Sequence, residues 1–275
     1  ALLMNVKVLD DDGWGSASDV IAGMEWAAAQ DADVINVSIG AGPSDGRDPL
    51  SQAVNAVTEA YGVLVVASAG NLGFLESAIE SPGAADAALT VGNVTKDGEL
   101  FWDSSRGPRL GDHAVKPEIT APGTDIGAPR AAGTSLGSVI DQHYTRLTGT
   151  SAAAPHAAGA AALLLEQRPG LSPEELKAAL VSTASPHPDL TVYHQGSGRL
   201  DVARALTQTV TAAPAVLNLG SFDYPQEEGV LAQGTVIYRN RGDADVTLSL
   251  TLGLSDDIGR ALPAEHVRLR HDTVT

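Results

Sequence analysis

Residues 149–165 read Gly149-Thr150-Ser151-Ala152-Ala153-Ala154-Pro155-His156-Ala157-Ala158-Gly159-Ala160-Ala161-Ala162-Leu163-Leu164-Leu165. Nearly every side chain in this run is small, which predicts a helix that lies close against neighbouring elements. Ser151 stands at the N-terminal edge of this helix, where backbone N–H groups and the positive end of the helix dipole would stabilise an oxyanion. The alternative is a buried, alanine-rich helix in which a serine or threonine serves only as N-cap. This segment by itself leaves both interpretations open.

The sequence before this helix predicts an α/β domain with a parallel sheet. Three short apolar runs have the continuous hydrophobicity of strands that are covered on both faces. They lie at 34–39, 62–67 and 88–92. Between them, 18–30 and 49–61 place apolar residues on one helical face, as crossover helices do. Further along, Ser172-Pro173-Glu174-Glu175 combines an N-cap serine, a first-turn proline and a capping-box glutamate, and predicts a helix to about Ala184.

A second segment helps to interpret the predicted helix that carries Ser151. Ala67-Ser68-Ala69-Gly70-Asn71 follows a buried strand and ends in an amide that can donate a hydrogen bond to a developing oxyanion. A strand ending in Gly-Asn is by itself usually a turn. In chain order with 34–40 and the serine helix, however, it resembles the subtilases, the subtilisin-like serine proteases. Further segments match in the same order: Lys7-Val8-Leu9-Asp10, Gly23-Met24-Glu25-Trp26, 101–108, 116–123 and 198–202.

The resemblance covers residues 1 to about 206 and implies a serine endopeptidase. The implied fold is α/β, with three layers around a mostly parallel sheet. Ser151 then corresponds to the nucleophile that attacks the scissile carbonyl and forms an acyl-enzyme. Asn71 corresponds to the side-chain donor of the oxyanion hole, and the backbone N–H of Ser151 to the second donor.

The resemblance also assigns the substrate-binding segments. One segment corresponds to the edge strand that pairs with an extended substrate backbone, namely Ser38, Ile39 and Gly40. Another corresponds to the opposite wall of the first specificity pocket, namely Ala67, Ser68 and Ala69. Counting back from Pro82-Gly83 places Glu80 near the base of that pocket, where a carboxylate favours a basic or polar substrate side chain. A solvated loop glutamate is the alternative.

Two residues near these motifs are excluded from catalysis. Gly133-Thr134-Ser135 repeats the tripeptide, but Leu136-Gly137-Ser138 follows it in place of alanines and Pro-His, so Ser135 is not expected to be the nucleophile. His156 lies five residues after Ser151 on the same helix, where side-chain directions keep its ring away from the hydroxyl. In subtilases the histidine at this place is structural, and the same is expected here.

The base that a serine nucleophile requires, and the carboxylate that orients the base, are not found. In subtilases both precede the serine in the chain. No Asp-Thr-Gly or Asp-Ser-Gly occurs, and none of the seven histidines stands in a His-Gly-Thr-His context. We therefore expect an N-terminally truncated domain, a fragment of an active protease that is poorly stable and inactive alone. The alternative is a pseudo-enzyme, a non-catalytic module that holds peptides without cutting them.

The C-terminal part changes to Thr, Val and Leu in period-two alternation, most clearly at 246–252. Asn240-Arg241-Gly242-Asp243-Ala244 separates this run from 235–238, which predicts a hairpin. We expect a peptidase domain over 1–206 and a partial fibronectin-like β-sandwich over 207–275. The insertion at 131–147 resembles larger bacterial subtilases, and its sequence indicates no role.

The composition limits the classes of partner. The chain has 17 Lys plus Arg against 34 Asp plus Glu, a formal net charge of −17, which argues against nucleic acid. Without cysteine there is no disulfide scaffold or thiolate nucleophile, and no run of 18 apolar residues predicts a membrane span. The resemblance implies secretion, a polypeptide substrate, a propeptide and calcium binding. No residue can be assigned to calcium, and no other cofactor is identified.

Overall fold

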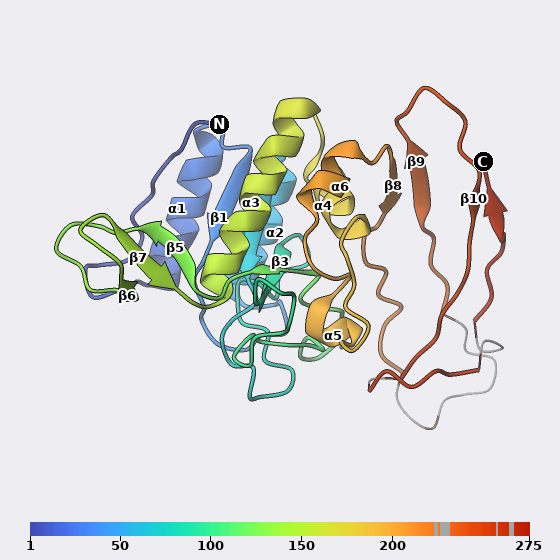
Figure 1. Cartoon of the computed structure of the whole chain (residues 1–275), viewed down its shortest axis with the longest axis horizontal. Helices are drawn as coiled ribbons and strands as arrows, with labels where there is room; N and C mark the ends of the chain where they lie inside the picture. Colours follow the sequence, from blue (N-terminus) through green and yellow to red (C-terminus); the bar gives the residue numbers. More distant parts are fainter. Residues whose placement is uncertain (223–224, 226–231, 257, 264–266) are drawn as a thin grey trace.

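The computed structural model describes residues 1–222, 225, 232–256, 258–263 and 267–275 (Figure 1). Its central element is a four-stranded parallel sheet in the order β1-β2-β3-β4. The strands are β1 (Val34–Val37), β2 (Leu64–Ser68), β3 (Leu89–Val94) and β4 (Ile119–Pro122). Since parallel strands end at a common edge, the segments that follow β1 and β2 emerge side by side.

Helices cover both faces of this sheet. On one face lie α1 (Ala17–Ala29) and α2 (Pro49–Tyr61), and on the other α3 (Thr150–Gln167) and α4 (Pro173–Ser182). The side chains of β2 alternate between the two cores, because Leu64 and Val66 pack with α3 and α4 whereas Val65 and Ala67 pack with α1 and α2. The predicted three-layer α/β architecture is confirmed.

The helix boundaries follow the local signals in the sequence. The backbone N–H of Glu175 donates to the Ser172 hydroxyl at 3.2 Å, and that of Ser172 donates to the Glu175 carboxylate at 3.1 Å, so the predicted capping box starts α4. Asp48 caps α2, which ends at Gly62 with a left-handed φ of 68°. The helices predicted at 18–30 and 49–61 are confirmed as α1 and α2.

The insertion at 131–147 belongs to a small antiparallel sheet. Its strands are β5 (Ile126–Pro129), β6 (Ser138–Val139) and β7 (Tyr144–Leu147), in the order β5-β7-β6. Figure 1 shows this sheet projecting from the α/β layers just before α3 begins. Two short helices, α5 (Val192–Gln195) and α6 (Val202–Thr207), lead to the C-terminal region.

The predicted hairpin between 235–238 and 246–252 is wrong. The described strands are β8 (Val210–Ala213), β9 (Ile237–Asn240), β10 (Leu248–Ser249) and β11 (Thr273–Val274). β9 pairs with β8, and β10 pairs with β11. Arg239 and Arg241 bind Glu175 at the start of α4, which holds β9 beside β8. These two small sheets do not confirm a partial β-sandwich, and the division into 1–206 and 207–275 stays a prediction.

A buried charge cluster joins α4 to the sheet. Glu118 Oε1 accepts hydrogen bonds from Lys116 Nζ at 2.8 Å and from Lys177 Nζ at 2.6 Å, and Oε2 accepts one from the Thr90 N–H at 2.7 Å. The side chains of Lys116 and Glu118 are only 3% and 4% exposed. A carboxylate at this depth is stable because two ammonium groups surround it.

Replacing Glu118 by glutamine is expected to lower the free energy of unfolding by about 3–5 kcal/mol, because two buried ammonium groups would lose their counter-charge. Asp125→Asn is the matched control, since the Asp125–Arg146 pair is half exposed and is worth less than about 1 kcal/mol. Urea unfolding followed by tryptophan fluorescence measures both variants. Equal losses in the two would show that the buried cluster is not a stabilising centre.

Candidate active site

Ser151 is the second residue of α3 and is exposed. Gly149 is the N-cap of this helix and has no side chain to cap it, and the Thr150 N–H donates instead to Asn71 Oδ1 at 2.9 Å. Gly149 has φ 145°, and a Cβ there would come within 3.2 Å of Asn71 Oδ1. A glycine is therefore required for the helix to begin this close to Asn71.

Ser151 and Ser38 are joined by two reciprocal hydrogen bonds. The Ser38 hydroxyl donates to the Ser151 carbonyl at 2.9 Å, and the Ser151 hydroxyl donates to the Ser38 carbonyl at 3.3 Å. Pro155 explains the first bond: it has no N–H, so the Ser151 carbonyl lacks its usual partner four residues ahead in the helix. Asn36 Nδ2 donates to the Ser38 hydroxyl at 3.0 Å and orients it. The segment after β1 is thus held against the start of α3.

The amide of Asn71 is oriented by the residue before Ser151. Asn71 Oδ1 accepts a hydrogen bond from the Thr150 N–H at 2.9 Å and lies 3.1 Å from Thr150 Oγ1. Thr150 is fully buried, and its hydroxyl accepts a hydrogen bond from the Gly70 N–H at 3.2 Å. Because Oδ1 faces Thr150, the Nδ2 donor faces away from it. The sequence analysis did not single out Thr150, since only the fold brings it to a residue 79 positions away.

The two segments predicted to bind substrate lie at the same sheet edge. Ser38 and Ile39 are half-buried and Gly40 is exposed, directly after β1. The residues predicted as the opposite wall have buried side chains: Ala67, Ser68 and Ala69. Since these side chains are packed into the fold, the wall would present mainly its backbone to a substrate.

The carboxylate of Glu80 lies between these two segments. Glu80 Oε1 accepts a hydrogen bond from the Gly42 N–H at 3.2 Å, and Oε2 accepts one from the Asn71 N–H at 3.0 Å. A Cβ on Gly40 would lie 3.1 Å from the carboxyl group, and one on Gly70 would lie 2.3 Å from Oε2. Because its carboxylate accepts hydrogen bonds from Gly42 and Asn71, Glu80 is not a purely solvated loop residue, and its assignment to the pocket base stays a prediction.

The comparisons with known proteins identify the family. The model of the subtilase family matches residues 1–212. This chain belongs to the subtilase family. Subtilisin DY from Bacillus licheniformis is 38% identical over 205 residues, which cover 74% of this chain and 67% of that protein. Serine protease AprX from Bacillus subtilis strain 168 is 32% identical over 231 residues, covering 75% of this chain and 51% of AprX.

A solved subtilase structure agrees with the fold. The patellamide maturation protease PatA superimposes with a TM-score of 0.60 at 32% identity, over 74% of this chain and 72% of PatA. The chain is therefore a subtilisin-family serine protease domain with the α/β subtilase fold. Members of this family act on polypeptide substrates. The chain spans from half to two thirds of the length of the curated relatives named above.

Three of the described histidines of this subtilase chain have side-chain contacts away from Ser151. His156 Nδ1 lies 3.0 Å from the Ala152 carbonyl of its own helix. His113 Nδ1 contacts the Ser221 hydroxyl at 3.2 Å, and His187 Nε2 lies 3.6 Å from Glu99. His266 lies outside the described residues. Among the residues that the structure describes, no histidine is hydrogen-bonded to Ser151.

Ser135 lies apart from these contacts. It is exposed in the turn that precedes β6, and the structure records no contact between it and Asn71 among the described residues. No helix begins at Ser135, so it lacks the N–H groups of a helix N-terminus that adjoin Ser151. Of the two Gly-Thr-Ser serines, Ser151 is therefore the one that lies at the start of a helix and next to a residue hydrogen-bonded to Asn71.

The described part of the chain holds no metal-binding cluster and no membrane-spanning helix. Within it, no three or more His, Cys, Asp or Glu side chains gather as a metal site would require. The calcium implied by the family resemblance stays a prediction. In the same part of the chain, every helix is too short or too polar to span a bilayer.

Proposed function

We propose that the protein is a serine endopeptidase that cleaves peptide bonds through an acyl-enzyme on Ser151. One observation carries the proposal: Ser151 lies in the first turn of α3, beside an asparagine whose amide Thr150 orients. Two donors, Asn71 Nδ2 and the Ser151 N–H, are then available for the oxyanion of a tetrahedral intermediate. A plain buried helix needs neither an exposed serine nor an oriented amide at its start.

The proposed reaction proceeds in two steps. An extended substrate pairs with the backbone of Ser38, Ile39 and Gly40, which places its scissile carbonyl at Ser151. Ser151 Oγ forms a bond to the carbonyl carbon as its proton passes to a base, and the C–N bond then breaks while the base protonates the leaving amine. A water molecule next attacks the acyl-enzyme carbonyl and gives a proton to the base. The C–O bond to Ser151 Oγ then breaks and the base returns that proton to Oγ, which releases the acid product and restores the serine hydroxyl.

We infer that the base and its orienting aspartate come from polypeptide outside these 275 residues. Two observations support this inference: the Ser151 hydroxyl donates to the Ser38 carbonyl, and none of the described histidines is hydrogen-bonded to Ser151. A serine whose proton is held by a carbonyl is a weak nucleophile. The 275-residue chain alone is accordingly proposed to be inactive, and the full-length protein to be active.

Glu80 is proposed to set the substrate preference. Its carboxylate lies between the two pocket segments and adjoins Gly40 and Gly70. A lysine or arginine side chain that enters between these segments would gain a charge-assisted hydrogen bond. Secretion, a propeptide and bound calcium remain parts of the same proposal that rest on family membership.

The test is active-site labelling of the full-length protein with a fluorophosphonate. We expect one equivalent of adduct, located by peptide mapping on the fragment that contains Ser151, and no adduct on the 275-residue chain alone. Cleavage of a casein substrate should disappear as the adduct forms. A folded full-length protein that takes no label and cleaves no casein would instead identify a peptide-binding module.

A further inference from the structure

The pocket base is part of a short antiparallel pair of backbone segments. The Ala41 N–H donates to the Ser81 carbonyl and the Ser81 N–H donates to the Gly42 carbonyl, both at 2.9 Å. The Ser44 N–H donates to the Ile79 carbonyl at 3.0 Å. Residues 41–44 and 79–81 therefore move as one unit, and Glu80 lies in the middle of the second segment.

Asp48 binds both segments of this pair and the helix behind them. Its Oδ1 accepts hydrogen bonds from the Ser81 hydroxyl at 2.5 Å and from the Leu50 and Ser51 N–H groups at 3.0 and 3.1 Å. Its Oδ2 accepts from the Ser51 hydroxyl at 2.6 Å and from the Ser44 hydroxyl. One carboxylate thus connects 41–44, 79–81 and the first turn of α2.

These contacts exceed what a helix cap requires. An N-cap aspartate satisfies one or two backbone N–H groups, which Leu50 and Ser51 supply here. The three hydroxyl groups are additional, and their serines, Ser44, Ser51 and Ser81, are all buried. Partial burial opposes ionisation of Asp48, but the hydrogen bonds from these three hydroxyls outweigh it and lower its pKa to about 2. The carboxylate is therefore charged at neutral pH and accepts all five bonds.

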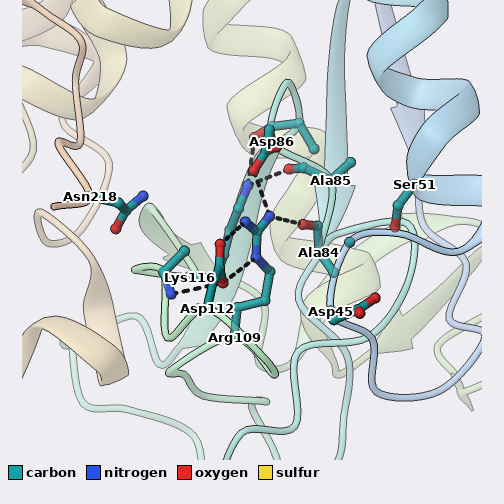
Figure 2. Close-up of polar contacts among 12 residues, drawn as sticks. Asp45, Ser51, Ala84, Ala85, Asp86, Arg109, Asp112, Lys116 and Asn218 are labelled. Carbon is teal, nitrogen blue, oxygen red and sulfur yellow. Dashed lines mark hydrogen bonds and ion pairs between the residues drawn. The ribbon is translucent and has the colours of Figure 1, made fainter. Parts of the chain in front are cut away.

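Residues 84–86, which follow the segment of Glu80 in the chain, are held by a separate set of contacts. Arg109 donates to the Ala84 carbonyl and to the Asp86 carboxylate, both at 2.6 Å, and also binds Asp112 (Figure 2). The Arg109 side chain is only 7% exposed. Residues 84–86 are held in this way, and the contacts of Ser81 and Ser44 with Asp48 restrain the residues around Glu80, together with the hydrogen bonds that Glu80 itself accepts from Gly42 and Asn71.

We propose that Asp48 is a positioning residue for substrate specificity, which acts by holding the segment of Glu80 in register against residues 41–44. The inference rests on the proposed function of Glu80 as the pocket base. Glu80 receives one hydrogen bond from Gly42, inside the pair that Asp48 ties together, and one from Asn71, outside it. When Asp48 is lost, the pair loosens and the carboxylate leaves its place between Gly40 and Gly70. A basic substrate side chain then loses its counter-charge, whereas an apolar side chain still contacts the walls of the pocket.

The experiment uses the full-length protein and two chromogenic peptides that differ only in lysine or leucine at the P1 position. Glu80→Gln is expected to lower the Lys-to-Leu ratio of kcat/KM by about tenfold or more, because an interacting charge is removed. Asp48→Ala is expected to lower the same ratio by about fivefold, mainly through a higher KM for the lysine peptide. In a double variant that carries Glu80→Gln, Asp48→Ala should not lower the ratio further, because the effects of substitutions at interacting residues are not additive.

Two further variants separate positioning from helix capping. Ser81→Ala removes one hydroxyl and leaves the cap of α2 intact, so it should fold and lower the ratio about twofold. Asp201→Ala is the matched control, because it also removes a helix-capping aspartate, that of α6, and Asp201 has no recorded contact with residues 41–44 or 79–81. It should leave the ratio unchanged.

Each result has a defined meaning. If Glu80→Gln abolishes the preference while Asp48→Ala and Ser81→Ala leave it intact, the positioning role is overturned and the pocket assignment stands. If Glu80→Gln leaves the ratio unchanged, the pocket assignment and the inference built on it both fail. If Asp48→Ala lowers kcat/KM equally for both peptides, Asp48 is only a helix cap and the inference is likewise overturned.

Discussion

Replacing Ser151 by alanine is expected to lower kcat of the full-length protein by about 10⁶, a magnitude measured for the serine of a subtilisin. In the proposed mechanism Oγ is the atom that bonds to the substrate carbonyl, so alanine would remove the acyl-enzyme pathway altogether. KM should change little, since the substrate backbone pairs with residues 38–40 and not with the hydroxyl. Initial rates of cleavage of a chromogenic peptide measure the effect. The concentration of active sites in the unmutated protein is determined by titration, so that its rate can be converted to kcat.

Ser135→Ala is the matched control for this prediction. Ser135 ends the second Gly-Thr-Ser of the chain but is exposed in the turn before β6, away from the start of α3. Its replacement should leave kcat unchanged. A Ser151→Ala protein that retains more than about one hundredth of the activity would refute the assignment of the nucleophile.

Replacing Asn71 by alanine is expected to lower kcat by about 10²–10³, again a magnitude known from a subtilisin. Asn71 Nδ2 would bond to the oxygen of the tetrahedral intermediate, which is charged only near the transition state, so the loss should appear in kcat and not in KM. Steady-state kinetics on the same peptide separate the two constants.

Thr150→Val provides a graded comparison for Asn71. Valine removes the hydroxyl that lies 3.1 Å from Asn71 Oδ1 but keeps the Thr150 N–H that also binds it. We therefore expect a smaller fall in kcat, of about tenfold. If Asn71→Ala raised KM and left kcat unchanged, the amide would be a substrate-binding group and not an oxyanion donor.

Much of the fold was predictable from local patterns. The continuous apolar runs at 34–39, 62–67 and 88–92 became the strands β1, β2 and β3, of which β2 and β3 are buried along their whole length and β1 is only partly buried. The capping box at Ser172 and Glu175 started α4 where expected. Such signals are reliable because caps and apolar periodicity act within a few residues.

The candidate site residues were predictable in part, from the order of motifs along the chain and not from local hydrophobic patterns. Ser151, Asn71 and Glu80 came from motif order and spacing, and the fold places all three at one edge of the sheet. Thr150 and Asp48 were missed, because a threonine beside a serine and an aspartate before Pro49 have ordinary local explanations. The hairpin at 240–244 was wrong because β9 pairs with β8 and β10 pairs with β11, and strand pairing between distant segments is not set by a local turn signal.

The sequence by itself determined which segments become strands and helices, the family, and the identity of the candidate nucleophile, since these depend on short-range patterns and ordered motifs. Only the tertiary structure decided how those parts act on one another. It turned the Asn71 amide toward Thr150, set the Glu80 carboxylate between two pocket segments, and joined three serines to Asp48. The physical reason is that hydrogen bonds between residues distant in the chain depend on where the sheet and helices bring them, which no local pattern records.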